Sequence, residues 1–350
     1  MLDRDRYWDC LEQAHEASSG GRVDEALSWL AEALRANPRG AEAHNGRGEI
    51  FWDNGRYAQA LTEFTLAVEA DPTYYGAALN RIEILIEEFP RQEEALGLCD
   101  ELLATSLEPL QGDERRSVEA ELYYLKAKAL FYLDDLEGAL FLLRRALKVQ
   151  GETGTYRGFE GQILFELGRF EAAQRSLERA RILDPDSAHS LYHAALVAEQ
   201  LGDFQEAEQL FARAASLAPD LYPLPVRISE QEFQAVVREA IDSLPAGLRR
   251  HVKDCPILVQ DLPSQELIER ERVSPQTLGL FEGVPLTQAT RSGAGDVRVD
   301  HDCILLFKRN LEKAASEREN LIEEIQKTVQ HEIGHYLGLG EEEIEKLGLG

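Results

Sequence analysis

The 350-residue chain is 44% hydrophobic and 29% charged, and its formal net charge is −27. This length and composition are typical of a soluble globular protein with two or more domains. The strong negative charge argues against nucleic acid and anionic membranes as partners, because both call for basic patches.

The ends and the cysteines indicate the compartment. The N-terminal stretch MLDRDRYWDCLEQ is too polar for a signal peptide, and no apolar run approaches the length of a membrane span. Four cysteines are scattered without a CxxC pair, at Cys10, Cys99, Cys255 and Cys303. We therefore expect reduced thiols in a cytoplasmic protein, with neither a disulfide frame nor a cysteine zinc site.

A repeated pattern occupies the first two thirds of the chain. Ala26, Ala33 and Pro38 recur 34 residues later as Ala60, Ala67 and Pro72. The same spacing relates Ala173, Ala180 and Pro185 to Ala207, Ala214 and Pro219. Small residues at fixed helical positions let two antiparallel helices approach closely, and proline ends the second helix. The pattern predicts stacked helix pairs.

These segments resemble tetratricopeptide repeats in period and in position. The small and aromatic positions of that family are occupied by Gly48, Phe51, Ala60, Phe64, Ala67 and Pro72, and again by Gly161, Leu164, Ala173, Leu177, Ala180 and Pro185. We place repeats near 7–40, 41–74, 120–153, 154–187 and 188–221, with a poorer one within 75–119. The resemblance implies an all-α solenoid over 1–222 with five to six repeats and a groove that binds a protein or peptide. A rigid spacer is the alternative.

Most of the acidic excess precedes Leu224, so a basic partner would be attracted to the repeats first, although a solvated acidic face is the simpler interpretation. One histidine pair also lies within the repeats. His189 and His193 are four residues apart in HSLYH, but no glutamate follows the first and no third ligand is evident. We expect them to line the groove, not to bind a metal.

A second domain is predicted over 223–350, with its own core. Ser229 and Glu232 form a capping box at the start of a helix. CPILVQDLP, LGLFEGVPL and CILLFKRN are predicted strands, and TRSGAGDVRVDH is a glycine-rich hairpin or loop. A long helix follows from about Ala315 to Leu337, with one apolar face. These elements predict a small α+β domain.

The sequence HEIGH at the end of that helix suggests a metal site. His331 and His335 lie on one face of a helix, so both imidazoles can bind one ion. Glu332 is rotated by about a third of a turn, which directs its carboxylate to a water on that ion, where it can act as a general base. The alternative is a pair of surface histidines with a solvated glutamate.

The third ligand is expected just after the helix. Gly338, three residues after His335, can adopt the left-handed conformation that ends the helix and turns the chain back. Glu341, three residues further on, then reaches the open position. This resembles the metzincin spacing HExxHxxGxxH with glutamate in the last place, although the chain has no methionine beyond Met1 for a methionine turn. Glu342 and Glu343 are rivals.

The region from about Ser229 to Gly350 resembles the bacterial minimal zincin-like metallopeptidase family. The resemblance rests on ILVQDLPSQELI, LGLFEGVPLT, CILLFKRNLE and TVQHEIGHYLGLGEEEIEKLG. It implies a zincin fold and a zinc site completed by an acidic residue at the place of Glu341. Tyr222, His301 and Arg291 are candidates for stabilising an oxyanion, but a structural role is the simpler interpretation of each.

The leading hypothesis is therefore a zinc-dependent metallopeptidase with one Zn²⁺ per chain. His331, His335 and Glu341 would bind the metal, Glu332 would be catalytic, and the repeats would recruit a protein substrate or partner. The alternative is a non-enzymatic adaptor whose C-terminal domain holds a structural or inactive zinc site. With either function, the array could also block the site until a partner binds.

Overall fold

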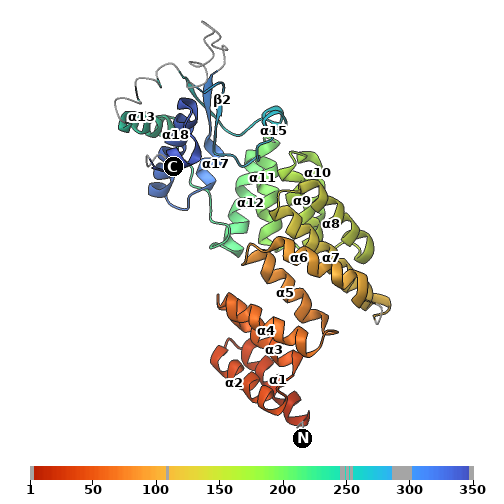
Figure 1. Cartoon of the computed structure of the whole chain (residues 1–350). Helices are drawn as coiled ribbons and strands as arrows, with labels where there is room; N and C mark the ends of the chain where they lie inside the picture. The colour runs from red at the N-terminus through yellow and green to blue at the C-terminus, as the bar shows by residue number, and fades with distance from the viewer. Residues whose placement is uncertain are drawn as a thin grey trace. The chain divides into compact units, whose positions relative to one another are not determined.

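The structure, a computed structural model, describes residues 4–107, 110–244, 249, 252, 255–285 and 302–346. The chain divides into two compact units, Met1–Tyr156 and Arg157–Gly350. Helices follow one another in pairs, and a small three-stranded sheet lies in the C-terminal part (Figure 1). The predicted fold class, an all-α repeat array followed by a small α+β region, is confirmed. Across the described residues, no helix combines the length and apolar character needed to cross a membrane.

The first unit contains four helix pairs. They are α1 (Arg4–Ser19) with α2 (Val23–Ala36), α3 (Ala41–Asp53) with α4 (Tyr57–Ala70), α5 (Tyr75–Glu87) with α6 (Gln92–Glu101), and α7 (Gly112–Tyr132) with α8 (Leu136–Gln150). Ala26, Ala33, Ala60 and Ala67 are fully buried. A Cβ at Gly48 would overlap the ring of Phe64, so the small residues permit the close helix approach that the repeat pattern predicts.

The poorer repeat within 75–119 also forms a helix pair. The irregular spacing there corresponds to a π-helical turn, η1 (Leu102–Ser106), after α6. A π turn inserts one extra residue into a helical turn, which shifts the register of everything that follows. This insertion accounts for the irregular spacing that follows α6, while the helix pair itself remains.

The second unit begins within α9 and contains the last two helix pairs. They are α9 (Gly154–Glu166) with α10 (Phe170–Leu183) and α11 (Ala188–Gln200) with α12 (Phe204–Leu217). Five further helices and the three-stranded sheet follow among the described residues of the same unit. The last two repeats and the C-terminal region therefore share one compact unit. The predicted domain boundary at 222/223 stays a prediction.

The C-terminal region is built around a mixed sheet. Its strands are β1 (Ile257–Gln260), β2 (Gly279–Glu282) and β3 (Cys303–Phe307), in the order β1-β3-β2. The central strand β3 is parallel to β1 and antiparallel to β2. Its helices are α13 (Glu230–Ser243), α15 (Gln265–Glu271), α17 (Lys308–Lys313), α18 (Arg318–Leu337) and α19 (Glu341–Lys346).

The long helix α18 packs between α13 and the sheet (Figure 1). Leu321, Ile325, Val329 and Ile333 form its buried stripe, and all four are 0% exposed. Burial of four such side chains contributes about 1.5–3 kcal/mol each, so this stripe fixes the rotation of α18 about its axis. The histidines on the same helix are held in place by that rotation.

Most local predictions for this region hold. Ser229 caps α13 by accepting a hydrogen bond from the backbone N–H of Glu232. The segment CILLFKRN, predicted as one strand, is a strand only to Phe307, because Lys308 begins the short helix α17. The long helix begins at Arg318 and not near Ala315. The predicted hairpin or loop over 290–301 lies outside the described residues.

Candidate metal centre

Helix α18 presents both histidines of HEIGH on one side of its last turns. The ring centroids of His331 and His335 are 4.6 Å apart, and their Nε2 atoms are 3.0 Å apart. Both side chains are 32% exposed, so their nitrogens are reachable from solvent. Partial burial lowers the pKa of His335, which favours the neutral imidazole that binds metals.

The turn after α18 brings the acidic segment back toward these nitrogens. Gly338 ends the helix in the left-handed conformation, with φ 81° and ψ 25°. Its N–H donates to the carbonyl of His335, and the N–H of Leu339 donates to the carbonyl of Gly334. A side chain at Gly338 would strain this turn, because its positive φ is costly for other residues. The chain reverses, and α19 begins at Glu341.

A second glycine lets α19 dock on α18. A Cβ at Gly334 would lie 2.7 Å from Cγ1 of Ile344, so the absence of a side chain there admits Ile344. Ile344 is 1% exposed and belongs to the hydrophobic core of the C-terminal region. This contact fixes the distance between the two helices. Glu341 is thereby held beside the histidines, although its own side chain is 74% exposed.

The structure brings three potential ligands together. Glu341 Oε1 lies 3.4 Å from His335 Nε2, and Glu341 Oε2 lies 3.8 Å from His331 Nε2. Ligand atoms of the three residues all lie within 4.8 Å of one another, and no other such group of three occurs in the described ranges. Tetrahedral zinc with bonds of about 2.1 Å requires ligand atoms about 3.4 Å apart. The donor set and its spacing fit zinc.

The two rival glutamates have other contacts. Glu342 Oε2 lies 3.3 Å from Lys346 Nζ, and Glu343 accepts a hydrogen bond of 3.1 Å from the N–H of Gly340. The latter contact caps the start of α19, where a carboxylate is favoured by the helix dipole. Neither is grouped with the histidines. The assignment of Glu341 as the third ligand stays a prediction.

Glu332 points to the strand β2 and away from bulk solvent. It is 8% exposed, and its Oε2 accepts a hydrogen bond of 2.8 Å from the backbone N–H of Phe281. A Cβ at Gly279 would lie 3.0 Å from Cγ of Glu332, so this glycine lets the strand approach the carboxylate. Burial raises the pKa of Glu332. A carboxyl group with a raised pKa is suited to accepting a proton and returning it.

A cavity of about 290 Å³ lies beside His331 and Glu332. Its other lining residues come from the start of β2 and from α18, namely Leu278, Gly279, Glu324, Lys327 and Thr328. A space of this size accommodates one or two amino-acid side chains.

The proposed oxyanion residues lie elsewhere or outside the described ranges. Tyr222 Oη lies 3.2 Å from Nδ1 of His189, and its ring centroid is 4.9 Å from that of Tyr192. His301 and Arg291 lie outside the described residues.

The histidine pair of the repeats is held by its own helix and by burial. His193 Nδ1 donates to the carbonyl of His189 at 2.9 Å, and burial lowers the pKa of His193 to about 3. His193 is thus a neutral, packed side chain.

Two known families match the two regions. The family described as "Zincin-like metallopeptidase" matches residues 252–350, and "Tetratricopeptide repeat" matches residues 11–75, 124–173 and 160–222. The chain carries tetratricopeptide repeats and a C-terminal zincin-like metallopeptidase domain. The zincin-like domain indicates possible peptidase chemistry, and its family implies zinc binding.

Similar curated proteins match over about half of this chain. The chain is similar to DnaJ homolog subfamily C member 3 of Rattus norvegicus, with 25% identity over 202 residues, 56% of this chain and 40% of that protein. The protein of the same name from Homo sapiens is 23% identical over 202 residues, which are again 56% of this chain and 40% of that protein. The chain thus spans less than half the length of these relatives.

Solved structures show the repeat fold alone. PilF of Pseudomonas aeruginosa aligns with a TM-score of 0.50 and 18% identity over 66% of this chain and 98% of that one. PilW, described as a widely conserved type IV pilus biogenesis factor, aligns with a TM-score of 0.52 and 18% identity. The alignment again covers 66% of this chain and 98% of that one.

Some residues outside the HEIGH motif hold the zincin-like site in place, and they were not identified from the sequence. Gly279 and Phe281 come from a strand about 50 positions before Glu332, and no local pattern pairs them with it. Ile344 could have been found, because it is the one apolar residue in EEEIEK and must be buried somewhere.

Proposed function

We propose that this protein is a zinc-dependent peptidase whose repeats bind a protein substrate or partner. His331, His335 and Glu341 would bind one zinc ion per chain, and Glu332 would be the catalytic general base. The observation that supports this most strongly is the close grouping of three ligand atoms next to a buried carboxylate. Bound zinc would lower the pKa of a water to about 7 and polarise the carbonyl of the scissile peptide bond.

Glu332 would move the proton in such a reaction. Its Oε2 is held by the N–H of Phe281, which leaves Oε1 to take a proton from the attacking water. The raised pKa lets the carboxyl keep that proton until the leaving amine accepts it. The cavity beside His331 would receive a side chain of the substrate next to the bond that is cut.

The repeats would supply recruitment. Tetratricopeptide repeats suggest protein interaction, and the acidic excess of this chain favours a peptide with lysine or arginine as the ligand. A cytoplasmic location is part of the proposal, because the four cysteines are scattered in the sequence without the spacing of a disulfide frame. We expect neither nucleic acid nor a membrane as the partner.

The experiment compares the wild-type protein with Glu332→Gln. Both should fold and bind equal zinc, because Glu332 is not placed among the ligands. Cleavage of a diverse peptide pool should fall by about 10²–10⁴-fold in the variant, which is the usual contribution of a general base. Glu342→Ala is a matched control, since it removes an exposed carboxylate near the site. The comparison is repeated on residues 224–350, where no repeat can cover the site. If zinc-loaded wild type cleaves no faster than Glu332→Gln in both forms, the protein is an adaptor and not a peptidase.

A further inference from the structure

The strand β2 is the part of the structure that touches Glu332 from the side opposite the helix. Gly279 lies against the side chain of Glu332, and the N–H of Phe281 holds its carboxylate. The position of β2 therefore decides where this carboxylate points. Only four residues form the strand, so its place depends on what holds the segment leading into it.

That segment, Ser274 to Thr277, is a turn held by the repeat helix α9. The N–H of Thr277 donates to the carbonyl of Ser274 at 3.1 Å, which closes the turn. Glu166, the last residue of α9, accepts a hydrogen bond of 2.8 Å from Ser274 Oγ and one of 2.7 Å from Gln276 Nε2. One carboxylate of the fifth repeat thus holds two side chains of the turn.

The helix α17 holds the same turn from its other side. Asn310 is 3% exposed, and its Nδ2 donates to the carbonyls of Pro275 and Thr277 at 2.8 Å each. Immediately after the turn, the N–H of Phe307 donates to the carbonyl of Leu278 at 2.9 Å. The entry to β2 is therefore hydrogen-bonded to the end of β3 and to α17.

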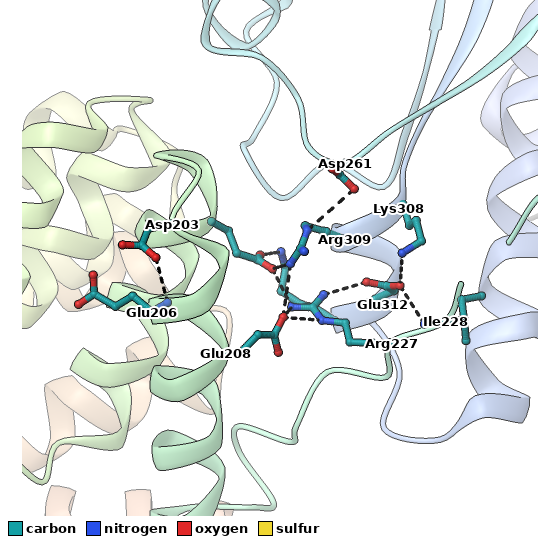
Figure 2. A network of polar contacts seen from close by, with 11 residues as sticks. Asp203, Glu206, Glu208, Arg227, Ile228, Asp261, Lys308, Arg309 and Glu312 are labelled. Atoms are coloured by element: carbon teal, nitrogen blue, oxygen red, sulfur yellow. Dashed lines mark hydrogen bonds and ion pairs between the residues drawn. The ribbon is translucent and has the colours of Figure 1, made fainter. Parts of the chain in front are cut away.

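The repeat helix α11 in turn holds α17. Glu199, whose side chain is 0% exposed, contacts Arg309 at 2.9 Å and also Lys313, both from α17. Figure 2 shows Arg309 and Arg227 pointing toward the repeat helices. Glu208 of α12 contacts both arginines. Glu312 of α17 contacts Arg227. A buried carboxylate with several cationic partners has one low-energy arrangement, because any displacement leaves charges unpaired.

We propose that the last two repeats position the strand β2 against the catalytic base, with Glu166 and Glu199 as positioning residues. Glu166 acts directly on the turn before β2, and Glu199 acts through α17 and Asn310. The proposal rests on the proposed function for its catalytic consequence. The last two repeats would then have a second role besides recruitment, because they hold in place the strand that contacts Glu332.

Glu166 is the better residue to test, because Glu199→Ala leaves the buried ammonium of Lys313 without a carboxylate partner and can prevent folding. Glu166→Ala removes two hydrogen bonds from a half-exposed position and should leave the fold intact. Asp186→Ala is the matched control. It removes a carboxylate that pairs with Arg213 within the same repeats, at 2.9 Å. Glu166→Gln keeps one carbonyl oxygen as an acceptor and serves as the conservative variant.

The first readout is amide hydrogen exchange of the full-length protein, measured by mass spectrometry on peptides covering 278–285 and 257–260. In Glu166→Ala the exchange of 278–285 should rise by about tenfold, as expected for losing hydrogen bonds to a charged group. The β1 peptide, on the far side of β3, should not change. Asp186→Ala should behave as wild type, and Glu166→Gln should lie between.

The second readout is the kinetics of peptide cleavage. In Glu166→Ala, kcat should fall by about tenfold while KM and zinc content stay unchanged. The reason is that the carboxylate of Glu332 would lose its orientation, whereas the three metal ligands would stay in place. A purely structural role would lower the melting temperature and leave kcat and exchange at β2 unaltered, which would overturn the proposal. If wild type cleaves nothing but exchange at β2 still rises in Glu166→Ala, the peptidase assignment fails and the positioning of β2 stands.

Discussion

The substitution Glu199→Gln tests how strongly the last repeat is joined to the C-terminal region. The carboxylate of Glu199 is buried and contacts Arg227 at 2.7 Å, Arg309 at 2.9 Å and Lys313. Glutamine has nearly the same size, so packing is preserved and only the charge and its acceptors are lost. Both arginines keep other carboxylate partners, Glu208 among them.

The cost falls mainly on Lys313. Its side chain is 6% exposed, and Glu199 is the carboxylate that it contacts among the described residues. Removing one partner of a buried ion pair typically costs about 3–5 kcal/mol, because the remaining charge has neither water nor a counter-ion. We therefore expect Glu199→Gln to destabilise the unit Arg157–Gly350 by about 3–5 kcal/mol. By comparison, the exposed pair Asp186–Arg213 should contribute about 0.2–1 kcal/mol.

The assay is urea unfolding followed by hydrogen exchange of peptides from α11 and α17. A single spectroscopic transition would mix the two compact units, whereas peptide-level exchange separates them. The double variant Glu199→Gln/Lys313→Met should recover most of the loss, because it removes the stranded charge. A single variant that costs less than about 1 kcal/mol, or a double variant that recovers nothing, would refute the reasoning.

Three further predictions concern the metal centre and its support. Glu341→Ala should lower zinc affinity at least tenfold in a chelator competition assay while Glu342→Ala leaves it unchanged; equal affinity in both would reject Glu341 as the ligand. Gly334→Ala should lower zinc affinity by about 10–100-fold by forcing Ile344 and α19 away, whereas Gly340→Ala, where a Cβ meets nothing within 4 Å, should not. Burial alone would raise the pKa of Glu199, but Lys313 and Arg227 lower it below its usual range. The ionised carboxylate of Glu199 should therefore stabilise the folded state fully at neutral pH and progressively less below about pH 5. On acidification, the urea midpoint of wild type should fall toward that of Glu199→Gln.

Features encoded over a few residues could be predicted from the sequence. The capping of α13 by Ser229 and the left-handed turn at Gly338 follow from a residue type at one position. The alanine and proline period predicted the helix pairs because each small residue is required by its own local packing. The metal motif could be recognised for the same reason, since both histidines belong to one helix.

Contacts between distant positions could not be predicted in this way. The bond from Phe281 to Glu332 joins residues 51 positions apart, and the bond from Lys313 to Glu199 joins residues 114 apart. Lys313 and Arg309 are ordinary surface residue types in a sequence, and nothing local marks them as partners of a buried carboxylate. The helix α17 was missed because its six residues are too few for a helical period to show.

These distant contacts bear on where the functional unit begins. From its apolar pattern, the region 224–350 is expected to fold alone, and its core is continuous. Cut at Leu224, however, that fragment loses Glu199 and Glu208, so Lys313 loses the carboxylate it contacts, while Arg227 keeps only Glu312 and Arg309 only Asp261 among the ion pairs described. It also loses Glu166, which holds the turn before β2.

We therefore expect a fragment of residues 157–350 to bind zinc and to melt well above residues 224–350. The comparison should include the shorter fragment with Lys313→Glu, which removes the stranded cation and places a carboxylate near Arg227 and Arg309 within the fragment itself. If that change raises its melting temperature toward that of the longer fragment, the missing carboxylate is the cause. If 224–350 already matches 157–350 in melting temperature and zinc affinity, the last two repeats are dispensable to the zincin-like domain and the boundary at 222/223 is the functional one.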